Sequence, residues 1–183
     1  MSGTGVSDPP VSSTGVSGAG AVAGDVLGAT GRYRGSVTLL HRDSAVRDID
    51  PLALYGLLKL RVDVFVVEQE CPYPELDGRD VEPDARMLWI EEDGEVLATV
   101  RLLCDGDDRR IGRVATAASA RGRGLAAERV ERALADCHGR LVRLDAQAHL
   151  EGWYARFGFA VDGEPFLEDG IPHVPMSRVV PAV

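Results

Sequence analysis

Long hydrophobic runs, clustered cysteines and clustered histidines are all absent from this 183-residue sequence. No apolar segment approaches the roughly 20 residues of a membrane-spanning helix, and the N-terminus lacks the basic segment and apolar core of a secretory signal. The three dispersed cysteines, Cys71, Cys104 and Cys137, are typical of a reduced cytosolic protein. The four scattered histidines give no ligand spacing for a metal. We therefore expect a cytoplasmic protein with no membrane partner and no metal.

Basic residues are in the minority, since 20 Lys and Arg face 29 Asp and Glu and the formal net charge is −9. This balance argues against a nucleic-acid partner. The carboxylates concentrate between Glu68 and Glu95, where eleven acidic residues accompany two arginines. That segment is either a solvated acidic surface or a rim that attracts a cationic, amine-bearing acceptor.

Residues 1–31 contain no lysine or arginine and little apolar periodicity. They include eight Gly, five Ser and three Thr. Such a composition buries too little apolar surface to offset the entropy that is lost on ordering. The sequence therefore predicts a disordered tail over residues 1–31 and a single domain over residues 32–183.

Hydrophobic periodicity and turn residues predict one order of elements along the domain. A helix is expected to begin at Asp50-Pro51, and Asp93-Gly94 is a strong hairpin signal. Glu128 and Arg132 lie four residues apart on a later helix and are expected to pair. The predicted order is a strand (36–41), a helix (from 50), a proline-bearing loop (71–84), three antiparallel strands (88–92, 95–104 and 109–116), a helix (126–137), a strand (141–147), a short helix (150–157) and two final strands (159–167 and 173–180).

A segment rich in glycine and arginine follows the third antiparallel strand and opens a helix. Such a segment suits an anion, because backbone N–H groups point outward and the helix dipole favours negative charge. Glycines let a ligand approach the backbone without a Cβ in the way, and arginine donors suit phosphate. A phosphorylated cofactor is therefore expected at Arg121, Gly122, Arg123, Gly124, Leu125 and Ala126.

Two cofactor interpretations fit these glycines. Gly122-x-Gly124-x-x-Ala127 satisfies a dinucleotide fingerprint, with Asp145 about 20 residues further on. Arg121-x-x-Gly124-x-Ala126 instead resembles the pyrophosphate loop of the GCN5-related N-acetyltransferases (GNAT), which bind acyl-CoA. The second interpretation is favoured because residues 117–121 separate the loop from the strand end and the preceding strands are antiparallel. An NAD-linked oxidoreductase remains as an alternative.

A second motif strengthens the GNAT resemblance. Residues 147–159 are similar to the family's Asn-x-x-Ala-x-x-x-Tyr-x-x-x-Gly-Phe, with Tyr154, Gly158 and Phe159 in place and Gln147 and Leu150 departing from it. A narrower resemblance, to the ElaA-type acyltransferases, covers residues 36–180 and rests on blocks 60–69, 71–73, 77–80, 111–114, 146–150 and 168–173. Met87 stands where that group often has His.

The resemblance implies an α+β GNAT fold with a mixed, mostly antiparallel central sheet of about seven strands flanked by helices. Splayed strands would form the acyl-CoA cleft, where backbone groups of Val114, Ala115 and Thr116 would pair with the pantetheine arm and an N–H near Val114 would serve the oxyanion. Residues 121–126 would bind the pyrophosphate, and Gln147 is assigned to the same cofactor site.

Two residues are candidates for proton transfer. By resemblance, Tyr154 would protonate the leaving thiolate, although a tyrosine on the apolar stripe of a helix is often a core residue. The upstream loop and the Gly158-Phe159 ending favour the catalytic interpretation. Glu68 is the candidate base, and its alternatives are a surface carboxylate or a partner for Arg61.

The candidate acceptor site joins residues that also resemble the acyl-homoserine-lactone synthases, which share the fold. It comprises Arg61, Phe65, Tyr73, Asp77, Arg101 and His173, the last of which is alternatively a structural residue of a turn. The sequence thus predicts an N-acyltransferase that moves an acetyl group from acetyl-CoA, or another acyl group from its CoA ester, directly to a primary amine of a small-molecule or peptide acceptor. A non-catalytic acyl-CoA-binding regulatory module is the alternative, and a homodimer is left open.

Overall fold

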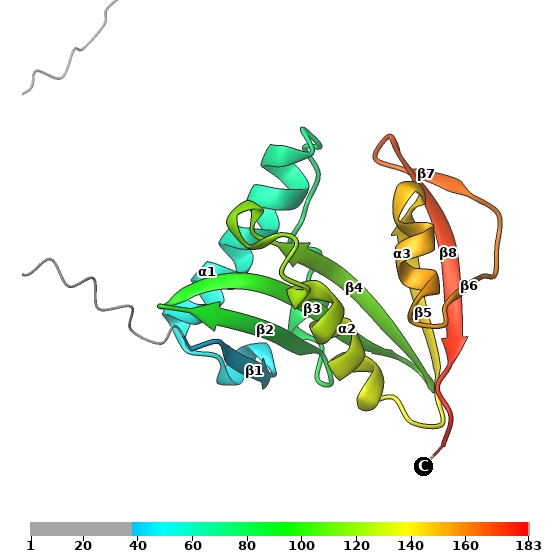
Figure 1. Cartoon of the computed structure of the whole chain (residues 1–183), viewed down its shortest axis with the longest axis horizontal. Coiled ribbons are helices and arrows are strands. Elements are labelled where there is room, and N and C mark those ends of the chain that lie inside the picture. The colour runs from blue at the N-terminus through cyan, green and yellow to red at the C-terminus, as the bar shows by residue number, and fades with distance from the viewer. Residues whose placement is uncertain (1–37, 183) are drawn as a thin grey trace, which may run out of the picture. The chain divides into compact units, whose positions relative to one another are not determined.

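The central feature of the fold is one mixed sheet, seen in a computed structural model that describes residues 38–182. The predicted tail, residues 1–31, lies outside the described residues, as does the start of the strand expected at 36–41. The eight strands of the described part follow the order β1-β2-β3-β4-β5-β8-β6, and β7 also pairs with β8 (Figure 1). They are β1 (Leu40–Ser44), β2 (Arg86–Glu92), β3 (Glu95–Asp105), β4 (Asp108–Thr116), β5 (Leu141–Gln147), β6 (Ala160–Val161), β7 (Phe166–Glu168) and β8 (Ile171–Val179).

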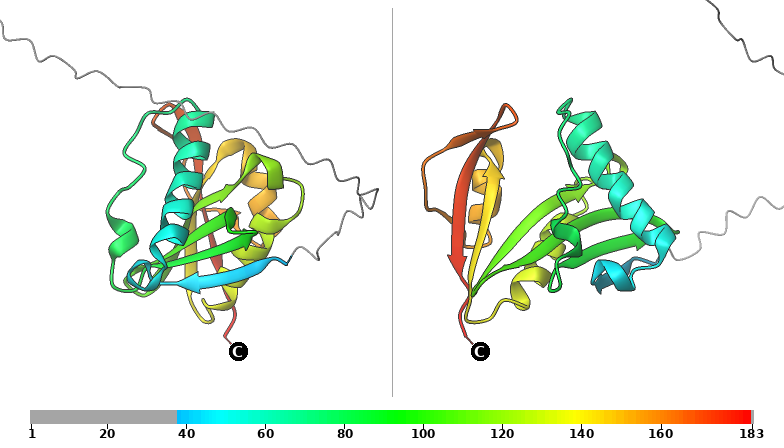
Figure 2. Two further views of the ribbon diagram at one scale, coloured as in Figure 1. Left: turned by 90° about the vertical axis from the view of Figure 1, so that its left-hand side faces the viewer. Right: turned by 180° about the vertical axis from the view of Figure 1, so that it is seen from behind.

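Helices cover both faces of the sheet. Helix α1 (Pro51–Val62) begins at Asp50, whose carboxylate accepts hydrogen bonds from the first turn, and continues as the π-helical segment η2 (Asp63–Glu68). Helices α2 (Leu125–Ala135) and α3 (Glu151–Ala155) lie on the opposite face (Figures 1 and 2). Short 3-10 turns are η1 (Val46–Asp48), η3 (Arg79–Val81), η4 (Ala118–Ala120) and η5 (Ala148–Leu150). The observed architecture is the α+β arrangement that the resemblance implies, with a mixed, mostly antiparallel sheet flanked by helices.

The alternation of side chains along the strands separates two apolar cores. Val142, Leu144, Val174 and Met176 belong to the core under α2 and α3. The residues that alternate with them on β5 and β8 therefore point to the α1 face. Met87, which stands where the ElaA-type group often has His, is buried in the core under α1.

Two predicted strands differ from those observed. The first strand spans Leu40–Ser44, further along the chain than 36–41. The segment expected as one strand at 159–167 is instead β6 and β7, separated by residues that include Gly163 and Pro165. A Cβ on Gly163 would lie 2.8 Å from Pro175 Cγ, and Pro165 cannot donate to a strand ladder. The chain therefore leaves the sheet between the two short strands.

The expected pair between Glu128 and Arg132 on α2 is also wrong. Glu128 lies 3.0 Å from His41 Nδ1 and 2.9 Å from Arg129 Nη2. Arg132 instead lies 3.2 Å from Asp136, the C-cap residue of α2, and 3.7 Å from Asp43 of β1. Tertiary partners from β1 thus replace a weak contact within the helix.

A β-bulge bends β4 at the point where it faces the proline-bearing loop. Arg113 and Val114 of β4 oppose the single residue Val100 of β3. Arg113 has φ 52°, in the left-handed region that residues other than glycine seldom adopt. The Arg113 guanidinium reaches Glu75 (2.7 Å) and Asp77 (3.1 Å), both in the loop.

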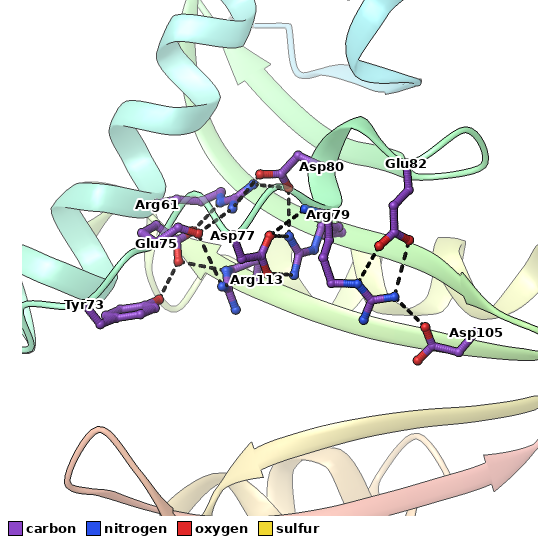
Figure 3. Close-up of polar contacts among 10 residues, drawn as sticks. Arg61, Tyr73, Glu75, Asp77, Arg79, Asp80, Glu82, Asp105 and Arg113 are labelled. Carbon is purple, nitrogen blue, oxygen red and sulfur yellow. Dashed lines mark hydrogen bonds and ion pairs between the residues drawn. The ribbon is translucent and has the colours of Figure 1, made fainter.

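Buried ion pairs fix the proline-bearing loop against α1 and β3 (Figure 3). Arg61 of α1, with 1 % of its side chain exposed, contacts Glu75 and lies 2.8 Å from Asp80 Oδ1. Arg101 of β3 lies 2.9 Å from the same Asp80 oxygen, so this carboxylate joins two elements of the core to the loop. Burial alone would raise the pKa of Asp80, but hydrogen bonds and charge from Arg61 and Arg101 outweigh it and lower the pKa.

Replacing Asp80 by Asn removes the carboxylate that joins Arg61 and Arg101. Because losing one partner of a buried ion pair leaves an uncompensated charge, we expect Asp80→Asn to lower the free energy of unfolding by about 3–5 kcal/mol at pH 7. Because the folded-state pKa of Asp80 is lowered, its contribution to the free energy of unfolding is complete above a pH of about 4. That contribution is lost as the pH falls through the folded-state pKa. The two proteins should therefore converge in acid, as urea unfolding at several pH values would measure.

A matched control for this prediction is Glu82→Gln. Glu82 pairs with Arg79 at the surface, where each side chain is 35 % exposed. An ion pair of this kind contributes about 1 kcal/mol or less. Equal losses in the two variants would contradict the bridging role of Asp80.

Candidate active site

A cleft opens where β4 and β5 part. These parallel strands pair only at Arg109–Val142 and Arg110–Arg143 and then diverge (Figure 1). The cleft has a volume of about 1050 Å³ and takes its walls from both faces of the sheet. Val114, Ala115 and Thr116 lie along it, as expected from the resemblance. Beyond Arg110, the β4 backbone has no partner strand on its β5 side within residues 38–182.

The glycine loop lies at the α2 end of the cleft. Gly122 and Gly124 have φ values of 76° and 81°, and an added Cβ on either would meet no heavy atom within 4 Å. The backbone N–H groups of Gly122, Arg123 and Gly124 donate to no backbone carbonyl within residues 38–182. The loop is thus an open cradle of donors at a helix N-terminus, as an anion site requires.

Both arginines of the glycine loop have carboxylate partners in this structure. Arg121 Nη2 lies 2.6 Å from Glu68 Oε2, and Arg123 Nη2 lies 2.6 Å from Glu92 Oε1. Only Arg121 and Ala126 of the predicted cofactor residues in this loop line the cleft itself. Leu125 is buried and packs in the core rather than facing a ligand.

Tyr154 lies on the α3 wall of the cleft. It is 7 % exposed, and its ring makes an edge contact with Trp153 at 4.7 Å between centroids. Among residues 38–182, its hydroxyl has no hydrogen-bond partner. Burial raises the pKa of Tyr154, so the phenol stays protonated at neutral pH. The geometry therefore provides a protonated group at the cleft.

Glu68, the predicted base, lies on the α1 side of the cleft at the end of η2. The hydrogen bond from Arg121 lowers the pKa of Glu68, and the carboxylate is thereby a weaker base than a free one. Beside it, Gln69 accepts a hydrogen bond from Gln147 at 3.0 Å. This contact joins the two walls of the cleft across the gap between α1 and β5.

The remaining α1-side wall is built on the proline-bearing loop. The Tyr73 hydroxyl donates to Glu75, and burial together with this bond raises the pKa of Tyr73. Asp77 accepts two hydrogen bonds from Arg101, at 2.7 and 2.8 Å. Burial would raise the pKa of Asp77, yet the bonds and charges of its arginine neighbours lower it overall. Arg113 lies over the Tyr73 ring, 5.8 Å from its centroid.

Most predicted acceptor residues meet at this cleft, with one exception. Phe65, Tyr73, Asp77, Arg101 and His173 all line it. Arg61 does not, because Glu75 and Asp80 enclose its guanidinium behind the wall. Arg61 therefore positions the wall rather than contacting a ligand.

Sequence reasoning missed Arg113 and Gln69. Arg113 reaches the cleft only because the β-bulge turns it toward the loop. Gln69 follows the π-helical segment, and its partner Gln147 is 78 residues away in the chain. Neither feature leaves a local pattern in the sequence.

None of the helices within residues 38–182 is long and apolar enough to cross a membrane. The same residues contain no group of three or more His, Cys, Asp or Glu side chains placed to bind a metal ion.

Comparisons with known proteins agree with this geometry. The family described as "Acetyltransferase (GNAT) domain" matches residues 59–180. A UPF0039 protein of Mycobacterium tuberculosis is 53% identical over 137 residues, which cover 72% of this chain and 88% of that protein. The ElaA protein of Escherichia coli is 41% identical over 134 residues, covering 69% of this chain and 88% of its own length.

Solved structures extend the likeness to three dimensions. The crystal structure of an acyl-CoA N-acyltransferase from Pseudomonas aeruginosa has a TM-score of 0.74 at 42% identity, covering 78% of this chain and all of that one (100%). An acyl-homoserine-lactone synthase that is CoA-dependent shares the fold alone, with a TM-score of 0.63 and 18% identity over 77% of this chain and 82% of that one. The chain belongs to the GNAT acetyltransferase family, among relatives of the ElaA and UPF0039 type.

Proposed function

We propose that this protein is an N-acyltransferase that takes an acetyl group from acetyl-CoA and transfers it directly to a primary amine. The observation that carries the proposal is a cleft through the sheet with different chemistry on its two sides. The α2 and α3 side has the open glycine loop and Tyr154, whereas the α1 side has charged and titratable side chains. A thioester held between β4 and β5 would meet both.

The residues of the α2 and α3 side fit acyl-CoA. The free N–H groups at Gly122, Arg123 and Gly124 suit a pyrophosphate. The unpaired β4 backbone suits the amides of a pantetheine arm, which would add to the strand edge. Arg121 would exchange its carboxylate partner Glu68 for phosphate, a change that needs only a rotation of an exposed side chain.

The α1 side favours an acceptor that is positively charged. Glu168, the last residue of β7, and Asp169, on the turn that follows, line the cleft. Glu168 lies 3.9 Å from His173 Nε2, and Asp169 has no ionic partner within residues 38–182. Carboxylates at an entrance attract cations and raise their local concentration. We therefore propose a small or peptide acceptor whose amine arrives as an ammonium group.

Tyr154 supplies the proton that the leaving group needs. As the C–S bond breaks, the sulfur develops negative charge, and the phenol donates its proton to form the free thiol of CoA. The raised pKa keeps the phenol protonated until that moment. The phenolate then recovers a proton from the ammonium-type nitrogen of the acylated amine, directly or through water.

A substitution at Gly124 tests the cofactor assignment. Asn tolerates a positive φ, so Gly124→Asn should fold, but its side chain would project into the space that the pyrophosphate needs. We expect CoA to bind at least tenfold more weakly, about 1.4 kcal/mol, by titration calorimetry. Gly94→Asn, at a turn with nearly the same φ of 83°, is the control and should bind CoA normally. Unchanged affinity in a folded Gly124→Asn protein would refute the loop assignment.

Replacing Tyr154 by Phe tests the proton donor. Phe keeps the ring contact with Trp153, so the melting temperature should change little, while kcat should fall about 10²–10⁴-fold. The rate is measured as CoA released from acetyl-CoA in the presence of a panel of primary amines. Tyr55→Phe, on the exposed face of α1, is the matched control. A wild-type kcat in Tyr154→Phe would remove this residue from the mechanism.

The same assay separates the proposed function from its alternatives. If the protein binds CoA but releases no CoA from acetyl-CoA with any of the amines, a non-catalytic acyl-CoA-binding module is favoured. Binding of NAD in place of CoA would favour an oxidoreductase.

A further inference from the structure

His173 has one ring nitrogen fixed by the backbone and the other free to act. Its Nδ1 lies 2.9 Å from the carbonyl oxygen of Ile171. A carbonyl can only accept a hydrogen bond, so Nδ1 carries the proton and Nε2 has a lone pair in the neutral ring. The ring is 8 % exposed and stacks on Phe166, with 5.7 Å between centroids and 25° between planes. Its orientation is thus set by two neighbours.

The position of His173 on β8 directs it to the acceptor side of the cleft. Val174 and Met176, which belong to the core under α2 and α3, point to the opposite face, so the strand alternation turns His173 toward α1. Its neighbour across the sheet is Gln147, the residue that bonds to Gln69 on the α1 wall. His173 lines the cleft together with Tyr154, which comes from the opposite face.

Other titratable groups along the cleft are less suited to accept a proton. Asp77 accepts two hydrogen bonds from Arg101, and its arginine neighbours lower its pKa. Burial raises the pKa of Tyr73, so this phenol stays protonated. His149 is exposed, and among residues 38–182 it has no hydrogen-bond partner that would orient it.

We propose that His173 is the general base that deprotonates the acceptor amine. This inference rests on the proposed function and adds to it the second proton-transfer residue. The ammonium form of the acceptor, R–NH3⁺, gives one proton to Nε2 and becomes R–NH2. The amine nitrogen forms the C–N bond, the C–S bond breaks, and Tyr154 protonates the sulfur. The Tyr154 phenolate then takes the remaining extra proton from the acylated nitrogen, which leaves a neutral amide. The imidazolium then releases its proton to solvent, which accounts for the one proton that the overall reaction produces.

The charged groups near His173 agree with this role. Glu168 Oε2 lies 3.9 Å from Nε2 and would stabilise the positive charge that develops on the imidazole. Asp169, on the same turn, and Glu68, on η2, add negative charge to the cleft. From η5 and α3, His149 and the neutral phenol of Tyr154 face the same space.

The experiment compares pH profiles of kcat/KM for wild type and His173→Asn, using acetyl-CoA with spermidine, lysine methyl ester and phenethylamine as probes. Histidine is the side chain whose charge ordinarily changes between pH 5 and 8. The kcat/KM profile of wild type should therefore have an acid limb, in which activity falls as the pH falls. In His173→Asn, kcat/KM at pH 7.5 should fall about 10²–10⁴-fold, and the acid limb should disappear. The Asn amide can still donate to Ile171 O, and CoA affinity should be unchanged.

His138→Asn provides the matched control, because His138 is exposed and bonds to Pro181 O away from the cleft. Its profile should match wild type. For His173→Ala, added imidazole should restore part of the lost rate, which a purely structural role would not allow. A melting curve of each variant establishes that it is folded.

The outcomes distinguish the two proposals. A wild-type protein that binds CoA but acylates none of the probes contradicts the proposed function and leaves no reaction for His173. An active wild type with an intact acid limb in His173→Asn overturns the role of His173 alone. Loss of the limb in Glu68→Gln instead would assign the base to Glu68.

Discussion

The separation of β4 from β5 is the constraint on which the rest of the site depends. The halves of the sheet are joined where β4 pairs with β5, at Arg109 and Arg110. Beyond Arg110 the two strands diverge. The bulge at Arg113 bends β4. An unpaired strand edge inside a protein would normally be costly. The acyl-CoA proposed as cosubstrate would satisfy this edge by pairing with it.

The buried ion pairs are the second feature that shapes the cleft. Arg61, Arg101 and Arg113 face Glu75, Asp77 and Asp80, so three positive charges balance three negative ones. Their net contribution to stability is small or unfavourable compared with apolar packing, because six charged groups leave water. Their consequence is geometric. A loop with several prolines has few backbone hydrogen bonds of its own, and the arginines fix it as a rigid wall on the acceptor side.

In the proposed reaction the two walls have complementary roles. The α3 wall carries a phenol whose raised pKa suits it to give a proton, and the β8 wall carries an imidazole whose Nε2 has a lone pair when Nδ1 holds the proton. Both side chains line the same cleft. The backbone edge of β4 lies between them, where the thioester is expected. Direct transfer without a covalent enzyme intermediate fits this arrangement.

Features that depend on local spacing can be predicted from the sequence. The cap at Asp50, the Asp93-Gly94 turn and the glycine loop before α2 are each encoded within a few residues, as is the place of Tyr154 before Gly158-Phe159. Which charged residues meet depends on the folded chain. Folding places Arg61 behind the wall and pairs Glu68 with Arg121, and these partners are 14 and 53 residues apart. The strand alternation turns His173 into the cleft, where a bond to Ile171 O fixes one ring nitrogen. Hydrophobic periodicity indicates which face of a helix or strand a residue occupies. The residues that it contacts on other helices and strands are determined only when the chain folds.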